Sequence, residues 1–406
     1  MRYGPTLRAR AAIPTAYRTP ADPRPGRRRF LAVALLASCA SDAHRPAPPA
    51  DAAGAATAIV RRGGSIVSRW ADRTDAAATA PAAGEDCTAI YDPDRHRLVL
   101  FAGKNDADVN LAEVWEFDLA QETWQRVQTT GEQPPASEDH AAIHDPVGHR
   151  MIVHGGENGL TTNRTSALDL ATARWRDLTD ASSPPREDHT AVYDPHRKQM
   201  LVYGGRHTDG KTDHVDNDVF AFDLDPASPT FEHWRAVAVD GAQPLGRTDH
   251  AAVFDPQKDR MLVYGGYNKE KKELLGDTWQ LVLGPPSSGG IHWQQVKTRR
   301  SWPPRRRHAV GVLDTARNWF VICGGFGEEG YLNDVWALDL ATDIWLDVTP
   351  GPQPRIDHQA IFDPRAGHML LYGGDARLGH KFHDLWALQI EPDLPLQLML
   401  HAASNK

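Results

Sequence analysis

The residues best suited to chemistry in this sequence are acid–histidine pairs that recur along the chain. The pairs and their variants are Asp139-His140, Asp188-His189, Asp249-His250, Asp357-His358, Asp86-Cys87 and His308. Carboxylate and imidazole groups can move protons or bind metal ions. One ligand seldom makes the same contact with every repeat of a protein, however. The recurrence therefore predicts that these histidines pack or hydrogen-bond between repeated units.

A second cluster of polar groups lies in residues 207–218, which contain two histidines and several aspartates. Carboxylate oxygens and imidazole nitrogens are cation ligands, so Asp209, Asp213 and Asp216 are candidate metal ligands. The ordered spacing of an EF-hand is missing, which favours a solvated acidic loop. We predict no firm metal site and no cofactor, and we find no nucleophile-elbow or Ser-His-Asp phrase.

Composition limits the class of protein. The 406 residues include 45 Lys+Arg and 53 Asp+Glu, for a net charge of −8. An acidic balance argues against nucleic acid as a partner, because nucleic acid binding needs basic patches. Three cysteines are too few for a disulfide scaffold. The longest apolar run, Phe30 to Ala40, is shorter than the roughly 20 residues of a membrane-spanning helix.

The first part of the chain has the order of an export signal. Basic residues at 27–29 precede an apolar stretch that ends at Cys39. Arg-Arg-x-Phe-Leu resembles a twin-arginine signal, and Leu-Ala-Ser-Cys resembles the lipobox of bacterial lipoproteins, in which Cys39 would carry the lipid. We expect an export signal at 1–38, a disordered Ala/Pro-rich tether at 39–62, and a lipid-anchored location at the bacterial envelope, facing the outer membrane or periplasm. The export route stays open.

Six copies of one unit fill residues 85–390. The second residue of a Gly-Gly pair, which is Ala-Gly in the first unit, recurs at Gly103, Gly156, Gly205, Gly266, Gly325 and Gly374. Each unit has four strand-like pieces, of which the second is continuously apolar and the fourth begins with a tryptophan. Four antiparallel strands repeated six times predict an all-β, six-bladed β-propeller.

The repeated residues also resemble a known family. The Gly-Gly pair, the strand Asp334-Val335-Trp336 and the later tryptophan are similar to the kelch repeat. We therefore expect a kelch-type propeller over 63–391 and a C-terminal tail at 392–406. Trp70 resembles a fourth-strand tryptophan without its own unit, so we expect an N-terminal strand near Trp70 to close the ring. Residues 396–400 are the rival closing strand.

In such a blade the loop between strands two and three and the connection to the next blade emerge on one face. We call it the loop face and expect it to bind ligands. Its candidate ligand-binding residues are Arg186, Arg247, Arg306, Arg355, His207, Tyr267, Tyr331 and His380. The arginines have an alternative role, which is to brace neighbouring blades. Cys323 precedes a Gly-Gly pair, where a buried inert thiol is expected.

These features favour a lipid-anchored binding or scaffold module for a protein or a surface glycan, with no membrane contact beyond the anchor. The alternative is a periplasmic sugar-active enzyme, because exported kelch propellers include sialic-acid epimerases, which this chain resembles in repeat number. Arg186, Arg247 and Arg355 would then hold a carboxylate. Galactose oxidase-like propellers use a Tyr–Cys crosslink, and no matching Cys-Tyr-His set is apparent. A purely structural envelope protein is a third possibility.

Overall fold

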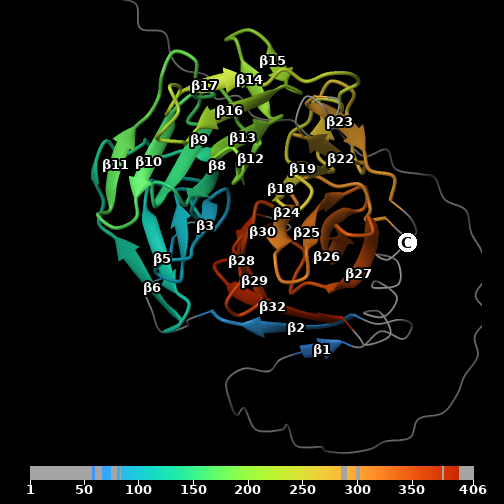
Figure 1. Ribbon diagram of the computed structural model, residues 1–406. Coiled ribbons are helices and arrows are strands. Elements are labelled where there is room, and N and C mark those ends of the chain that lie inside the picture. Colours follow the sequence, from blue (N-terminus) through green and yellow to red (C-terminus); the bar gives the residue numbers. More distant parts are fainter. Residues whose placement is uncertain are drawn as a thin grey trace, which may run out of the picture. The chain divides into compact units, whose positions relative to one another are not determined.

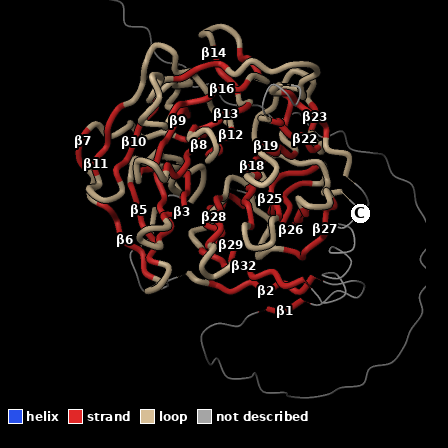
Figure 2. The backbone as a smooth tube through the Cα atoms, in the orientation of Figure 1, coloured by secondary structure: helices blue, strands red, loops and turns tan. Residues whose placement is uncertain are grey.

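The computed structural model describes residues 57–59, 66–74, 80–82, 84–284, 290–298, 302–376 and 379–392. The predicted export signal and Cys39 lie outside these residues, as does the rival closing segment 396–400. Every regular element in the described part of the chain is a β-strand (Figure 2). Among the same residues, no helix is long and apolar enough to cross a membrane.

The strands form six sheets, each with four main antiparallel strands in the order predicted for a blade. Blades 1 to 3 consist of β3 (Thr88–Asp92), β4 (Arg97–Phe101), β5 (Val114–Asp118) and β6 (Thr123–Val127); β8 (Glu138–Asp145), β9 (Arg150–Glu157), β10 (Thr165–Asp169) and β11 (Arg174–Asp177); and β12 (Thr190–Asp194), β13 (Gln199–Tyr203), β16 (Val219–Asp223) and β17 (Trp234–Ala236).

Blades 4 to 6 follow the same plan. They consist of β18 (Ala251–Asp255), β19 (Arg260–Tyr264), β22 (Thr278–Val282) and β23 (His292–Gln295); β24 (Val310–Asp314), β25 (Trp319–Gly327), β26 (Gly330–Asp339) and β27 (Ile344–Pro350); and β28 (Gln359–Asp363), β29 (His368–Tyr372), β32 (Leu385–Pro392) and β2 (Ile66–Asp72).

Short additional strands extend several of the blades. A parallel strand, β7 (Thr130–Gly131), joins β11 of blade 2. Small hairpins extend the loops between strands two and three of blades 3, 4 and 6, and they are β14 (Arg206–Thr208) with β15 (Asp213–Val215), β20 (Tyr267–Asn268) with β21 (Glu273–Leu274), and β30 (Asp375–Ala376) with β31 (His380–Lys381).

The first strands of the six blades surround a common centre (Figure 1). Contacts run from β3 to β8, β12, β18, β24, β28 and back to β3, so the ring is closed. The predicted six-bladed propeller is therefore confirmed. This arrangement brings the residues that precede each first strand to the same end of the central channel.

Blade 6 is completed from the N-terminal side. β2 pairs antiparallel with β32, and Trp70 stands opposite Leu388. The Trp70 side chain is buried in an apolar cluster with Val335 and Met369. The predicted closure by an N-terminal strand near Trp70 is confirmed.

One short strand lies inside the segment predicted as a disordered tether. β1 (Thr57–Ile59) pairs antiparallel with β2. The structure thus differs from the prediction for 39–62 at these three residues. Two of them are β-branched, and they cover an edge of β2 that would otherwise present unpaired backbone groups.

Tryptophans fasten each blade to the one before it. Trp175 of blade 2 packs on Phe101 of blade 1, with ring centroids 4.8 Å apart. Trp293 of blade 4 packs on Tyr203 of blade 3 at 4.6 Å. Such aromatic pairs contribute about 0.5–1.5 kcal/mol beyond their buried area. The fourth-strand tryptophan is therefore the side chain that fills the space between two sheets.

Candidate functional site

A ring of side chains surrounds the channel at the loop face. It consists of one residue at or just before the start of each first strand, namely Asp86, Asp139, Asp188, Asp249, His308 and Asp357. Their φ angles lie between 52° and 56°, a left-handed conformation that Asp and His adopt more readily than most residues. Backbone hydrogen bonds link neighbours, as from the Asp188 N–H to the Asp139 carbonyl at 3.0 Å. We call this set the channel ring.

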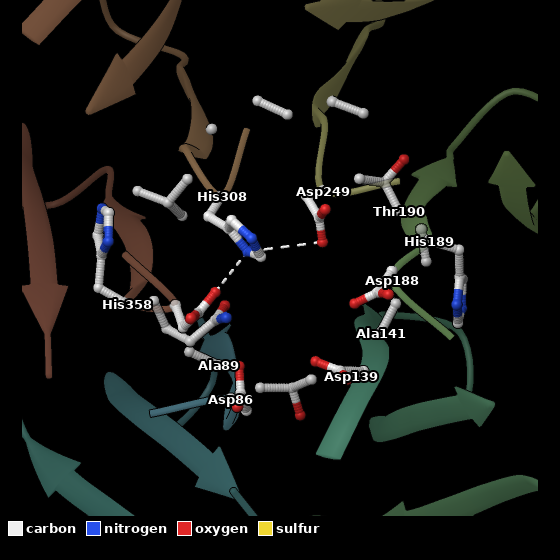
Figure 3. A pocket seen from close by; sticks show the side chains of 18 of the residues that line it. Asp86, Ala89, Asp139, Ala141, Asp188, His189, Thr190, Asp249, His308 and His358 are labelled. Carbon is white, nitrogen blue, oxygen red and sulfur yellow. Dashed lines mark ion pairs between the residues drawn. The ribbon is translucent and has the colours of Figure 1, made fainter. Parts of the chain in front are cut away.

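His308 is the one basic member of the channel ring. Figure 3 shows it between its neighbours Asp249 and Asp357, with a dashed line to each carboxylate. His308 Nδ1 lies 2.6 Å from Asp357 Oδ1 and 3.5 Å from Asp249 Oδ1. Burial alone would lower the pKa of His308, but the charges of Asp249 and Asp357 raise it to about 10. The side chain is therefore an imidazolium at neutral pH, and it ties blades 4, 5 and 6 together.

The opposite side of the channel ring has no equivalent cation. In the described part of the chain, Asp86 and Asp139 have no side-chain hydrogen bond or ion pair, whereas Asp188 accepts from Arg206 Nε at 2.8 Å. Burial, together with the neighbouring Asp357 for Asp86 and Asp188 for Asp139, raises the pKa of both carboxyls well above the usual range. Burial and Asp249 raise the pKa of Asp188 to about 7.

A second layer lies above the channel ring and differs between the two halves of the molecule. It is made of β-bridged pairs, which in blades 1 to 3 are Glu85·Lys104, Glu138·Glu157 and Glu187·Arg206, and in blades 4 to 6 are Thr248·Tyr267, Arg307·Phe326 and Ile356·Asp375. Members of both layers line a funnel of about 540 Å³ on the loop face, together with Lys269 and Lys272. Charged side chains of both signs surround it, and Tyr267 is the aromatic residue in its lining.

The histidines of the Asp-His pairs point away from the channel, as His189 and His358 do in Figure 3. They are buried against the Gly-Gly pair of the preceding blade, where a Cβ on Gly204 would lie 2.9 Å from His250 Cε1. His250 Nε2 also lies 2.7 Å from Thr190 Oγ1 of that blade. Burial lowers the pKa of His140 to about 4. The prediction that these histidines pack between blades is confirmed.

The arginines of the predicted ligand-binding face are buried rather than exposed. Arg247, Arg306 and Arg355 form ion pairs with Asp277, Asp334 and Asp384 of the same blade, which lie just before or, for Asp334, within its third strand. Arg186 binds Asp216 and Asp218 in the same way. The arginine side chains thus brace two segments of one blade. Their backbone carbonyls also join neighbouring blades, as predicted, because each accepts a hydrogen bond at 2.7–2.9 Å from a glycine N–H of the preceding blade. Ligand binding by them stays a prediction, and each guanidinium already has a partner.

The other predicted residues are spread over the loop face. Tyr267 lines the funnel, and the Tyr331 hydroxyl donates to Asp375 Oδ2 at 3.3 Å. His207 Nδ1 lies 2.9 Å from Asp216 Oδ2. His380 is exposed on its hairpin. These residues do not meet at one point.

The candidate metal ligands already have partners. Asp213 pairs with Lys269, and Asp216 pairs with both Arg186 and His207. Asp209 Oδ2 lies 3.6 Å from His214 Nε2. Metal binding at these aspartates stays a prediction. The two described cysteines, Cys87 and Cys323, are free and buried, and burial raises the pKa of both thiols to about 12.

Sequence reasoning missed two features of the loop face. One is the channel ring. The sequence marks it by an aspartate that recurs at the start of every unit except the fifth. The other is a set of exposed apolar side chains, which carries no repeat signal. The large hydrophobic side chains that are exposed in the described residues are Val109 (52%), Leu160 (70%), Leu245 (36%) and Trp302 (61%). All four lie in loops of this one face, and we call them the apolar rim.

The family follows from comparison with known proteins. The family model described as the KLHDC2/KLHL20/DRC7 Kelch-repeats domain matches residues 65–225 and 146–351. The chain belongs to the kelch-repeat family. Kelch-repeat propellers generally act as protein-interaction or scaffold modules.

Curated relatives match the repeat region. Adagio-like protein 3 of Oryza sativa subsp. japonica is 30% identical over 296 residues, 69% of this chain and 44% of the relative. Putative adagio-like protein 2 of the same plant is 29% identical over 302 residues, 69% of this chain and 45% of the relative. Kelch domain-containing protein 3 of Homo sapiens is 28% identical over 187 residues, 43% of this chain and 45% of the relative. The chain spans less than half the length of these relatives.

Proposed function

We propose that this kelch-repeat propeller is a protein-binding module that docks its partner on the loop face. The observation that carries the proposal is the apolar rim, because all four exposed large hydrophobic side chains of the described residues lie there. Loops that a rigid scaffold positions often carry binding residues, and these four side chains give the loop face apolar groups that a partner would cover. The funnel at the centre of the same face adds a concave surface for a partner side chain.

Site-specific photo-crosslinking tests this face. A photoreactive phenylalanine analogue replaces Leu160 on the loop face or, as the control, Gln121 in an exposed turn on the opposite face. We expect discrete crosslinked protein bands from position 160 and none from position 121. The bands should weaken when Trp302→Ser is added, since that residue belongs to the same rim. Equal crosslinking from the two positions would contradict the assignment.

We further propose that the propeller is held at a bacterial envelope by a lipid on Cys39. The support is the order of basic cluster, apolar stretch and Leu-Ala-Ser-Cys at residues 27–39. Radiolabelled palmitate should label the wild-type protein expressed in bacteria but not the Cys39→Ser variant. Both proteins should still be produced with a folded propeller. Palmitate labelling of the Cys39→Ser variant would contradict this proposal. It would not affect the proposal that a partner docks on the loop face.

A further inference from the structure

A second pocket lies between blades 2 and 3, away from the funnel, and we call it the side pocket. It has a volume of about 560 Å³, within the range of about 300–1,000 Å³ that is usual for small-molecule sites. Its lining includes β11 and the turns that join strands one and two of blade 2 and strands three and four of blades 2 and 3. These turns emerge at the end of each blade opposite the loop face, so the side pocket is separate from the docking surface proposed above.

One wall of the side pocket is a long loop of blade 3. The loop between strands three and four has ten residues in blade 3 (224–233) and four in blades 1, 2 and 5. The Thr230 hydroxyl donates to Asp223 Oδ2 at 2.7 Å and so ties the loop back to its own blade. The loop places Phe231 and Glu232 in the lining of the pocket, beside blade 2.

Arg150 of blade 2 contacts this loop and keeps one hydrogen-bond donor free. Its Nε atom donates to Asp145 at 2.7 Å, and one terminal nitrogen donates to Glu232 at 2.5 Å. In Arg260, its counterpart in blade 4, both terminal nitrogens have acceptors, one of them the Leu340 carbonyl of blade 5 at 3.1 Å. The second terminal nitrogen of Arg150 has no acceptor among the described residues, although Arg150 is only 8% exposed and lines the pocket. A ligand that accepts a hydrogen bond there would satisfy this donor.

Two further arginines line the side pocket, Arg174 and Arg176 of β11. Arg176 donates to the same Glu232 oxygen as Arg150, so two guanidinium groups share one acceptor atom. Arg174 makes no ion pair or side-chain hydrogen bond within the part of the chain that the structure describes. The lining therefore offers guanidinium donors that these residues leave unused.

The two remaining acids of the lining are held by backbone groups. Asp169 Oδ1 accepts from the N–H groups of Ala171 and Thr172 in its own turn, and Glu132 Oε2 accepts from the Asp177 N–H at 2.9 Å. Three arginines and three acids give the lining no net formal charge. The surplus is one of hydrogen-bond donors, which a planar acceptor such as a carboxylate can use in pairs.

We propose that the side pocket binds a small organic carboxylate that carries an apolar group. The carboxylate accepts hydrogen bonds from the free nitrogen of Arg150 and from Arg174. The apolar group packs on the uncharged part of the lining, which consists mainly of Val147, Ala167, Trp175, Leu224, Pro226 and Phe231. Apolar walls with a few directed polar groups are typical of small-molecule sites. The proposal does not depend on the partner of the loop face.

The probe is hydrocinnamate, a carboxylate with a phenyl ring. Its counterparts are hydrocinnamamide, which lacks the charge, and propionate, which lacks the ring. Titration of the full chain is followed by saturation-transfer difference NMR, and both counterparts are also measured as competitors. We expect hydrocinnamate to bind with a dissociation constant of about 1 mM or lower, and both counterparts to bind at least about tenfold more weakly.

A double substitution, Arg174→Gln with Arg176→Gln, removes two guanidinium groups from the pocket. Both side chains are exposed, so we expect the fold to be preserved. Arg126→Gln with Arg235→Gln is the matched control, because it makes the same charge change at exposed positions of β6 and β17, outside the pocket lining. The affinity for hydrocinnamate should fall about tenfold in the first variant and less than about twofold in the control.

The proposal is overturned if hydrocinnamate shows no binding at about 10 mM, or if hydrocinnamamide binds as tightly. Equal affinity in the two double variants would also overturn it, since binding would then not involve the arginines of the pocket. Propionate that binds as tightly as hydrocinnamate would contradict the role of the apolar lining. None of these results bears on crosslinking from position 160, which tests the loop face alone.

Discussion

Three consecutive arginines of blade 5 show how position, not residue type, determines the role of a side chain. Arg305 is exposed and pairs with Glu273 at the surface. Arg306 is buried, and its two terminal nitrogens lie 2.6 and 2.7 Å from the carboxylate of Asp334. Arg307 lies over the rings of Tyr267 and Phe326, 5.1 and 5.5 Å from their centroids, beside the funnel. These three adjacent arginines can be mutated one at a time to compare the same side chain in three different environments.

Arg306→Ala should destabilise the propeller far more than Arg305→Ala. The first substitution leaves Asp334 without its partner and removes a 3.0 Å hydrogen bond to the Gly324 carbonyl, which corresponds to a loss of about 3–5 kcal/mol for a broken buried pair. The second breaks an exposed ion pair, which contributes about 0–1 kcal/mol. Urea unfolding followed by tryptophan fluorescence measures both. Similar midpoints for the two variants would contradict the bracing role of Arg306.

At the scale of elements, ring closure depends on β2, the strand of blade 6 that comes from the other end of the repeat region. Its pairing with β32 extends from Ile66 opposite Pro392 to Asp72 opposite Trp386. Trp70 then fills the gap toward blade 5, in the role that fourth-strand tryptophans have in the other blades. Trp70 thus adds a large side chain to the contact between blades 5 and 6, beside the His308–Asp357 pair and the packing of His358.

Trp70→Ala should therefore lower stability by about 3–5 kcal/mol, as expected for a buried aromatic side chain. Trp302→Ala provides the control, because that tryptophan is exposed and its loss should change stability by less than about 0.5 kcal/mol. Thermal unfolding and limited proteolysis measure the difference, and the Trp70 variant should be cut first near residues 66–72. A stable, protease-resistant Trp70→Ala protein would show that the ring does not depend on this strand.

At the scale of the whole molecule, the channel ring connects the six blades, and its charge state links stability to pH. His308 has a folded pKa of about 10 against 6.5 in the unfolded chain. Because the pKa is higher in the folded state, protonated His308 contributes its full stabilisation of the folded protein below pH 6.5. This contribution is lost as the pH rises toward 10. The raised pKa of Asp188, about 7, also makes stability fall as pH rises from about 4 to 7.

His308→Gln should consequently lower the melting temperature most below pH 6.5, by about 2–5 °C, and progressively less as the pH approaches 10. His233→Gln is the control, since His233 is an exposed partner of Asp180 and lies outside the ring. Circular dichroism melts at pH 6, 8 and 10 give the comparison. A deficit that stays constant over this range would show that His308 contributes through packing and not through its charge.

Sequence patterns could predict the blades because each depends on residues that recur in register. Gly204 and Gly205 face side chains and backbone that leave no space for a Cβ, and Trp175 has a counterpart in every blade. The candidate site was harder to predict. The direction of the Arg247 guanidinium is determined by Asp277, far along the chain, and Leu160 and Trp302 have no repeat to mark them. Local sequence patterns contain neither the distant partner of a side chain nor the exposure of a loop residue outside the repeat.

The position of β2 also has a consequence for the timing of folding. The ribosome makes this strand before any blade, yet its partner β32 is the last strand of the repeat region to emerge. While blades 1 to 5 are being made, the β2 edge that will pair with β32 has no partner of its own blade. Resistance to proteases should therefore appear late and in one step, when Leu385–Pro392 leave the exit tunnel. Nascent chains arrested before that point would expose the unpaired backbone groups of this strand edge, which can pair with another chain.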